Sequence, residues 1–334
     1  MYTPERVILT GGAGFIGSHV LRFLVQKYPE VLWVCLDKLD YCASLKNLES
    51  LRDFKNFKFV KGDITSPDLV NYLLVSENID TIMHFAAQSH VDNSFGNSFQ
   101  FTHNNVMGTH VLLEASKVNK IKRFIHVSTD EVYGESKDEE KFYEGSMLNP
   151  TNPYASSKAC AELLVRAYMT SFGLPCIITR GNNVFGPNQY PEKLIPKFIS
   201  LLESEKPCCL HGDGTNQRSF IYIDDVVRAF DTVLMYGVVG ETYNIGTEFE
   251  ITNLDVAKTL LDEYGFNYKK FIEFTKDRAF NDKRYHIDNT KLQKFGWYPM
   301  VDFIEGLRKT ILWYKENPSY FGDIKNILVP HPNI

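Results

Sequence analysis

The chain has 334 residues, 44% of them hydrophobic and 23% charged, so it is long enough for about two domains and too apolar to be disordered throughout. Its 36 Lys and Arg against 41 Asp and Glu give a net charge of −5, which argues against a surface that binds nucleic acid or anionic membrane over its whole extent. The chain has no secretory signal and no run of about 18 apolar residues, so we expect no membrane span and a cytoplasmic location.

Short apolar, β-branched runs alternate with helical stretches through the first half of the chain. Strands are expected at Val7–Thr10, Val31–Leu36, Phe57–Val60, Thr81–Phe85, Phe124–Val127 and Cys176–Thr179. Helices are expected at Phe15–Lys27, 66–77, 103–119 and 154–172. This alternation predicts an α/β fold with a doubly wound parallel sheet of the Rossmann kind.

The pattern loosens after Arg180, where Pro, Gly and Asn interrupt the chain before helical patterns return. Helices are expected at 253–264 and 302–316, and Asn317–Ile334 reads as an irregular tail. We therefore expect a smaller, interleaved C-terminal lobe that binds substrate. The predicted division is a sheet domain of residues 1–178 and 218–246, and a lobe of residues 179–217 and 247–334.

The cysteines and histidines do not indicate a metal site or a disulfide framework. None of the six cysteines forms a CxxC pair, and Cys208 and Cys209 are adjacent, which suits neither a zinc site nor an ordinary disulfide. The nine histidines show no HExxH spacing. We expect reduced thiols and no bound metal.

A glycine-rich turn follows the first predicted strand and opens the first predicted helix. Gly11, Gly14 and Gly17 form GxxGxxG, the spacing that permits a tight turn, close approach of a pyrophosphate and packing of helix on strand. Asp37 ends the second strand about 20 residues later, where a carboxylate binds the adenosine ribose and repels the 2′-phosphate of NADP. The pattern predicts NAD as the cofactor.

Further cofactor contacts are expected where other strands and helices begin or end. The full predicted cofactor set is Gly11, Gly14, Phe15, Ile16, Gly17, Asp37, Lys38, Leu39, Asp63, Ile64, Phe85, Ala86, Ala87, Ser89, Asn104, Tyr154 and Lys158.

Tyr154 and Lys158 form a YxxxK pair at the start of a predicted helix, where the i, i+4 spacing puts both side chains on one face. A nearby ammonium and a cationic nicotinamide should lower the pKa of the tyrosine and favour the phenolate. Thr129 ends the fifth strand, at the sheet edge where ligands bind. Together these residues resemble the extended short-chain dehydrogenase/reductase superfamily, and the resemblance implies Thr129, Tyr154 and Lys158 as catalytic residues.

Asp130 and Glu131 follow Thr129 and resemble the acid pair of the nucleotide-sugar 4,6-dehydratases. Oxidation at C4 of a hexose acidifies the C5 hydrogen, so a carboxylate can remove that proton while a carboxylic acid protonates the departing C6 hydroxyl. The two environments must separate the two pKa values. The resemblance implies Glu131 as the base and Asp130 as the acid.

Segments of the second half are similar to the family's nucleotide-sugar contacts. The resemblance implies diphosphate contacts from Asn183 and Arg218, whose fork suits bidentate binding. Nucleotide contacts are implied around Lys193 and in Cys209–His211. The full implied substrate set is Ser89, His90, Asp92, Thr129, Asn183, Lys193, Leu194, Cys209, Leu210, His211, Arg218, Asn244, Arg278 and Asn281.

The segment Asp277-Arg278-Ala279-Phe280-Asn281-Asp282 departs from the form usual in bacterial dTDP-glucose 4,6-dehydratases and resembles the N-terminal dehydratase domain of plant UDP-rhamnose synthases. The resemblance implies UDP-glucose as the substrate. The plant proteins continue into an epimerase/reductase domain, so a separate partner enzyme is expected to carry the product toward UDP-rhamnose.

Three alternatives stay open on the sequence alone: a dTDP-glucose 4,6-dehydratase, a nucleotide-sugar 4-epimerase or decarboxylase, and a non-catalytic NAD-binding protein. We also expect a homodimer. The helices predicted at 103–119 and 154–172 carry apolar residues on more than one face, and in related enzymes this pair forms a four-helix bundle across a two-fold axis.

Overall fold

A seven-stranded parallel sheet forms the larger part of the protein, in a computed structural model that describes residues 1–137, 140–277 and 282–329. The strand order is β10-β6-β5-β4-β1-β2-β3. The strands are β1 (Arg6–Thr10), β2 (Leu32–Asp37), β3 (Phe57–Lys61), β4 (Thr81–His84), β5 (Arg123–Thr129), β6 (Cys176–Gly181) and β10 (Thr242–Ile245). The predicted doubly wound α/β fold is confirmed, while β10 was not predicted as a strand.

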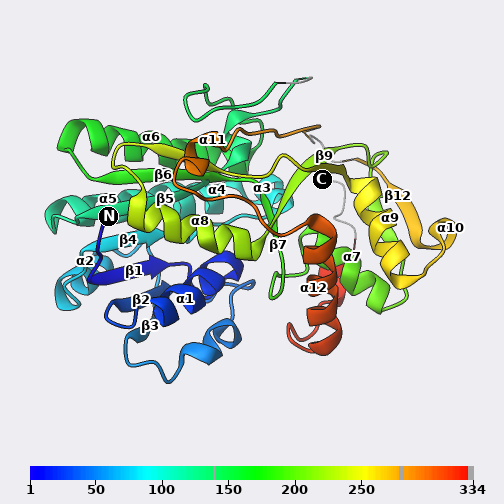
Figure 1. Cartoon of the computed structure of the whole chain (residues 1–334), viewed down its shortest axis with the longest axis horizontal. Coiled ribbons are helices and arrows are strands. Elements are labelled where there is room, and N and C mark those ends of the chain that lie inside the picture. Colours follow the sequence, from blue (N-terminus) through cyan, green and yellow to red (C-terminus); the bar gives the residue numbers. More distant parts are fainter. Residues whose placement is uncertain (138–139, 278–281, 330–334) are drawn as a thin grey trace.

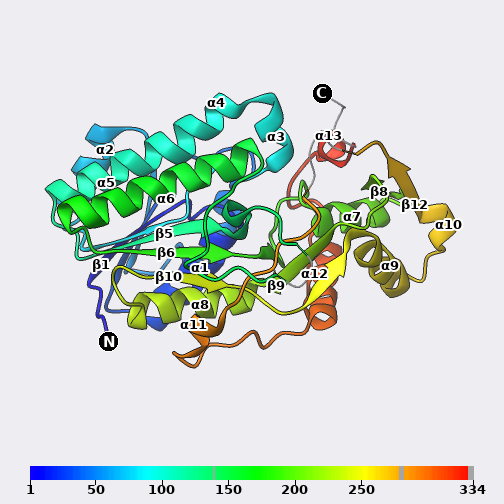
Figure 2. The same cartoon turned by 90° about the horizontal axis from the view of Figure 1, so that it is seen from above.

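Helices cover both faces of this sheet, as Figure 2 shows. On one face lie α2 (Pro67–Ser76), α5 (Gly108–Val118) and α6 (Pro153–Phe172), and on the other α1 (Phe15–Lys27) packs against α8 (Ile223–Tyr236). Successive residues of β1 point to opposite faces, so Val7 and Leu9 enter one hydrophobic core and Ile8 the other. A strand buried on both faces reads as a continuous apolar run, which is why β1 was recognisable from sequence.

The predicted helix at 103–119 is divided in the structure. Its first turns follow α3 (Val91–Gly96) and α4 (Ser98–Phe101) as a π-helical stretch, η2 (Thr102–Met107), before α5 begins. Within this wider turn the Asn105 side chain bonds Gln88 and Ser157, which ties the stretch to α6. π-Helical turns are frequent at functional sites.

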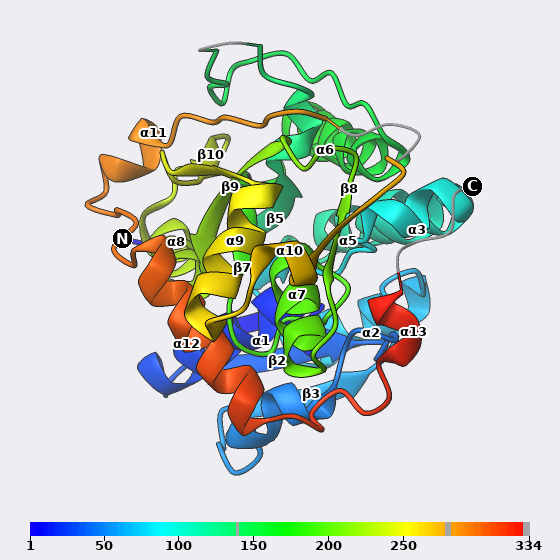
Figure 3. The same ribbon diagram turned by 90° about the vertical axis from the view of Figure 1, so that its right-hand side faces the viewer.

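The smaller lobe contains two further sheets and lies to the right in Figure 1. One sheet joins β7 (Asn183–Phe185), β9 (Gln217–Tyr222) and β11 (Glu250–Thr252), and the other joins β8 (Cys208–His211) and β12 (Ile272–Thr275). The lobe's helices, grouped in Figure 3, are α7 (Leu194–Glu203), α9 (Asn253–Tyr264), α10 (Tyr268–Phe271) and α12 (Phe303–Glu316).

The chain crosses between sheet domain and lobe more than once. β9 belongs to the lobe's three-stranded sheet, whereas α8, which directly follows it, packs on α1 in the sheet domain. We propose the division expected from sequence, with β9 as the junction. The expected irregular tail contains one short helix, α13 (Lys325–Leu328), and α11 (Thr290–Gln293) lies beside β10. The remaining short elements are the 3₁₀ turns η1 (Leu45–Leu51) and η3 (Asp130–Tyr133).

Candidate active site

A cavity of about 430 Å³ lies where the carboxyl ends of the sheet strands face the lobe. The ends of β1, β2, β4 and β5 supply one wall, and lobe segments around Lys193, His211 and Arg218 supply the other. Every residue of the predicted cofactor set except Leu39 lines this cavity. The sequence motifs therefore converge on one space.

Two glycines of the turn, Gly11 and Gly17, leave no room for a side chain. Gly11 has φ +74°, and a Cβ there would stand 2.6 Å from the backbone nitrogen of Ala86. A Cβ on Gly17 would stand 2.4 Å from the carbonyl oxygen of Gly11. Helix α1 starts directly after Gly14, and no side chain caps its N-terminus. The turn brings backbone and a positive helix end to the cavity, which suits a pyrophosphate.

Asp37 ends β2 with its carboxylate held in place by backbone amides. The N–H of Ala13 donates to Oδ2 at 2.9 Å and the N–H of Leu39 donates to Oδ1 at 2.7 Å. Burial raises the pKa of this carboxyl, and the two amides oppose that shift. Leu39 does not line the cavity, so its part in the site is this backbone contact. Lys38 donates to the Asn104 side chain at 2.9 Å.

Thr129, Tyr154 and Lys158 lie together at the cavity wall, from β5 and the first turns of α6. Burial, followed by the charge of Glu131, raises the pKa of the Tyr154 phenol, and a hydrogen bond with Thr129 opposes the rise. The Lys158 ammonium donates to the carbonyl of Val127 at 2.6 Å, and burial lowers its pKa to about 8. In the protein alone burial sets the direction, and the expectation that Lys158 and a bound nicotinamide lower the Tyr154 pKa stays a prediction for the enzyme with cofactor.

Asp130 is buried and Glu131 half-buried beside these residues, on the 3₁₀ turn η3. Burial raises the pKa of Asp130 to about 7, and the neighbouring charge of Glu131 adds to the rise. Burial also raises the pKa of Glu131. The side chain of Thr129 donates to Asp130 Oδ1 at 3.2 Å. A carboxyl that titrates near neutrality can serve as a general acid, as the sequence implied for Asp130.

Most of the predicted substrate residues also line the cavity. They are Ser89, His90, Thr129, Asn183, Lys193, Leu194, Cys209, Leu210, His211 and Arg218. Lys193 donates to the carbonyl of Ser89 at 2.6 Å, so the lobe and the sheet domain meet there. The Arg218 guanidinium lies 5.0 Å from the centre of the Tyr285 ring and donates to the carbonyl of Gln217.

Two other predicted substrate residues, Asn244 and Asp92, do not line it. Asn244 lies on β10, where it accepts from the Tyr133 hydroxyl at 2.8 Å and donates to two carbonyls, so a substrate contact for Asn244 is corrected to a structural role. Asp92 faces a separate pocket beside Phe101. Arg278 and Asn281 lie outside the described residues.

Several cavity residues were not singled out from sequence. They are Gln88, Asn152, Asn182, Glu192, Asp282 and Tyr285. Glu192 accepts from the Tyr41 hydroxyl at 2.7 Å, and Tyr285 donates to Asp282. Glu192 stands directly beside Lys193, a predicted substrate residue, so adjacency in sequence was the available signal for it.

No group of three or more His, Cys, Asp or Glu in the described part of the chain could hold a metal ion. Over the same residues, no helix is long and apolar enough to cross a membrane.

The GDP-mannose 4,6 dehydratase family matches residues 8–310. A trifunctional UDP-glucose 4,6-dehydratase/UDP-4-keto-6-deoxy-D-glucose 3,5-epimerase/UDP-4-keto-L-rhamnose-reductase of Arabidopsis thaliana is 56% identical over 336 residues, which cover 100% of this chain and 50% of that protein. The chain thus spans about half the length of this relative. The dTDP-D-glucose 4,6-dehydratase of Homo sapiens is 49% identical, with 98% of this chain and 95% of that protein covered.

Solved structures share the fold. The dTDP-glucose 4,6-dehydratase of Streptomyces venezuelae, solved with NAD bound, has a TM-score of 0.92 and 41% identity over 96% of this chain and 100% of that one. The UDP-glucose 4-epimerase of Thermotoga maritima, solved with UDP-glucose, has a TM-score of 0.87 and 28% identity over 94% and 100%.

Proposed function

The chain belongs to the GDP-mannose 4,6 dehydratase family, and from that premise we propose that it is an NAD-dependent UDP-glucose 4,6-dehydratase. It converts UDP-glucose to UDP-4-keto-6-deoxyglucose and water. The observation that carries the proposal is the acid pair Asp130 and Glu131, in the same cavity as Tyr154 and Lys158. A 4-epimerase or decarboxylase needs no acid–base pair for the loss of water, and a non-catalytic NAD-binding protein needs no proton relay.

The cavity fits NAD. The cradle at Gly11 and Gly17 would be filled by any Cβ, and Asp37 presents a carboxylate where a ribose hydroxyl would lie. The buried hydroxyl of Ser128, on the cavity wall, has no hydrogen-bond partner among the residues that the structure describes. Bound NAD supplies a hydride acceptor that ends each turnover oxidised. The same Asp37 carboxylate would repel the extra phosphate of NADP.

The chain's own residues divide the proton transfers. Tyr154 takes the proton of the C4 hydroxyl, and Thr129 hydrogen-bonds the reacting oxygen. Lys158 holds the ribose. Once C4 is a ketone, Glu131 removes the acidic C5 proton and Asp130 protonates the C6 hydroxyl, which leaves as water. The C5–H and C6–O bonds break, and the C5=C6 bond forms before hydride returns to C6 and a proton to C5.

UDP-glucose is favoured over dTDP-glucose by the higher identity to the trifunctional plant protein, 56% against 49% for the human dTDP-glucose enzyme. The test incubates purified protein with each sugar in parallel and assays 4-keto-6-deoxy product, with Tyr154→Phe as the inactive control. We expect faster product formation from UDP-glucose. Faster turnover of dTDP-glucose would assign the alternative substrate, and a changed stereocentre or unchanged sugar would overturn the dehydratase.

The protein acts as a homodimer, formed by the helices beside η2. Leu112, Leu113 and Val165, from which a second apolar face was predicted, are buried in the protein's own core. Val111 and Leu164, from the same prediction, are partly buried against that core. Leu163, also from that prediction, is 59% exposed on α6 and supports the dimer. Further support comes from Phe99 and Met107, which are 87% and 48% exposed on the adjoining elements α4 and η2. Sedimentation equilibrium should show a dimer that Leu163→Glu weakens. A wild-type monomer at micromolar concentration would contradict it.

The ketosugar product is consumed by a separate epimerase/reductase. The proposed dehydration already uses Asp130, Glu131 and Tyr154, the acid–base residues assigned in this cavity. Product should therefore accumulate as the 4-keto-6-deoxy sugar in the purified reaction and reach UDP-rhamnose only when an epimerase/reductase is added. Formation of a deoxyhexose without the added enzyme would contradict this.

A further inference from the structure

Asp130 and Glu131 each receive one hydrogen bond from the side-chain NH₂ of an asparagine. Asn182 Nδ2 donates to Asp130 Oδ2 at 2.7 Å, and Asn152 Nδ2 donates to Glu131 Oε2 at 3.1 Å. Both asparagines are buried on the cavity wall. The two acids are adjacent in sequence, whereas their partners come from the start of α6 and from the link between β6 and β7.

The orientation of each amide is fixed by a backbone N–H on its other side. Asn152 Oδ1 accepts from the N–H of Ala155 at 2.8 Å, as the N-cap of α6. Asn182 Oδ1 accepts from the N–H of Thr247 at 3.0 Å. Because an amide has one oxygen and one NH₂, these contacts leave only the NH₂ to face the acids. Both side chains are therefore committed donors.

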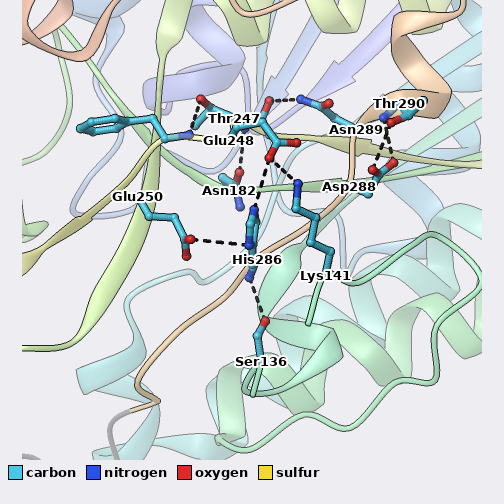
Figure 4. Close-up of polar contacts among 12 residues, drawn as sticks. Ser136, Lys141, Asn182, Thr247, Glu248, Glu250, His286, Asp288, Asn289 and Thr290 are labelled. Carbon is cyan, nitrogen blue, oxygen red and sulfur yellow. Dashed lines mark hydrogen bonds and ion pairs between the residues drawn. The ribbon is translucent and has the colours of Figure 1, made fainter. Parts of the chain in front are cut away.

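The loop that orients Asn182 is itself held from several sides, as Figure 4 shows. A Cβ on Gly246 would stand 2.4 Å from Asn182 Oδ1, so glycine makes room for the amide. Asn289 Nδ2 donates to the Gly246 carbonyl at 2.6 Å. Glu248 pairs with Lys141 and lies 3.6 Å from His286. Thr247 lies between Gly246 and Glu248 in sequence, so the contacts of these two neighbours hold the N–H that orients Asn182.

We propose that Asn152 and Asn182 are positioning residues that select which oxygen of each acid takes part in the elimination, an inference that rests on the proposed function. A committed donor can only meet an unprotonated oxygen. Asp130, when protonated, therefore carries its proton on Oδ1. The Thr129 hydroxyl donates to this oxygen in the charged acid, but a hydroxyl can rotate and accept, so it does not exclude the proton. Glu131 receives the C5 proton on Oε1. The asparagines thus aim the proton donor and the proton acceptor.

The first test is Asn182→Asp, which keeps the shape and the acceptor for Thr247 but replaces the donor with a carboxylate. Elimination should slow by about 10²-fold, the cost of misplacing a reacting group. Formation of bound reduced cofactor should stay within a few fold, and so should KM. Since the acid form of Asp130 is needed, elimination falls as pH rises through its pKa. The new charge and the lost donor raise that pKa, so the fall should move to higher pH.

Other groups facing Asp130 also act on its titration and stay unchanged in this variant. They are Glu131 on η3, Tyr154 on α6 and Arg218 on β9. The matched control is Asn188→Asp, the same change in a buried asparagine that donates to the Tyr320 hydroxyl, away from this loop and outside the cavity lining. In this control, elimination should fall at the same pH as in the wild type. Equal behaviour of Asn182→Asp and Asn188→Asp would overturn the proposal for Asn182.

The second test is Asn152→Ser. Serine retains the N-cap of α6 and is too short to reach Glu131. Elimination should again fall by about 10²-fold, while bound reduced cofactor forms at a near-normal rate. The pH at which elimination falls, which reports the pKa of Asp130, should not move in this variant. Equal loss in both steps would mean that Asn152 only supports the helix, and would overturn its positioning role.

A third readout needs no turnover and separates this proposal from the proposed function. Infrared titration of the resting protein, with Asp130→Asn as the reference, reports the carboxyl of Asp130. The midpoint should rise in Asn182→Asp and, through loss of the donor alone, in Asn182→Ala. An unmoved midpoint in both variants overturns the proposal even if the wild type makes ketosugar. A raised midpoint supports the Asn182 contact even if UDP-glucose is not the substrate.

Discussion

The two walls of the cavity are assembled in different ways. The sheet-domain wall is made of strand ends and the residues directly after them, so Gly11, Asp37 and Thr129 each follow from a local motif. The lobe wall joins segments far apart in the chain, as when β12 pairs with β8 and Ile272 lies opposite Cys208. The sheet wall carries the proposed chemistry and the lobe wall the proposed nucleotide contacts. Substitutions on the two walls should therefore affect different steps.

The largest effect is expected from Asp130→Asn combined with Glu131→Gln, on the sheet wall. General acid–base groups contribute about 10²–10⁴-fold, so dehydration should fall by at least that order. Some bound reduced cofactor should still form, because C4 oxidation precedes the elimination. Single-turnover absorbance beside a ketosugar assay measures both steps. Tyr154→Phe is the counterpart and should suppress reduction of the cofactor itself. Near-normal dehydration by the double variant would remove these acids from the mechanism.

Gly17→Val should weaken NAD binding by up to about 10²-fold, because its side chain would enter the space of the Gly11 carbonyl. The NAD content of the purified protein and calorimetric titration measure the change. Gly145→Val is the matched control, since a Cβ at Gly145 meets nothing within 4 Å. Equal NAD content in the two variants would show that the turn does not hold the cofactor.

The sheet domain could be predicted because its signals are local. The order of strands and helices and the family membership indicated by Thr129, Tyr154 and Lys158 are confirmed. The lobe's pairings depend on contacts distant in sequence, so β10 was read as a ligand segment and Asn244 as a substrate contact. The burial of Tyr154 is a related case: spacing shows that Lys158 is near, and it does not show that burial raises the pKa of the phenol in the protein alone.

On the lobe wall, Arg218→Lys should raise KM for UDP-glucose by about 10-fold, as lysine keeps the charge but loses the bidentate fork. The rate of cofactor reduction at saturating sugar should change little, in contrast to the sheet-wall variants. Steady-state kinetics measure KM, and Arg308→Lys is the control, since Arg308 pairs with Glu263 away from the cavity. If Arg218→Lys lowered only the rate at saturation, the two walls would not divide the work as proposed.

The smallest expected effect is on stability. It concerns Asp130, which also belongs to the double variant with the largest expected effect. Burial raises the pKa of Asp130 from an ordinary 3.8 to about 7, so the folded protein binds this proton more tightly than the unfolded chain. Its contribution to stability is complete below pH 3.8 and is lost as pH rises to about 7. Above that pH, wild type holds a buried charge that Asp130→Asn lacks. One pKa unit corresponds to about 1.4 kcal/mol, and relaxation around the site reduces the effect. We therefore expect the free energy of unfolding of Asp130→Asn to exceed that of the wild type by about 1–2 kcal/mol at pH 8.

Urea unfolding of both proteins at pH 5 and pH 8 measures this gain. The gain should be smaller at pH 5, and a gain equal at both pH values would show that the charge of Asp130 is not its source.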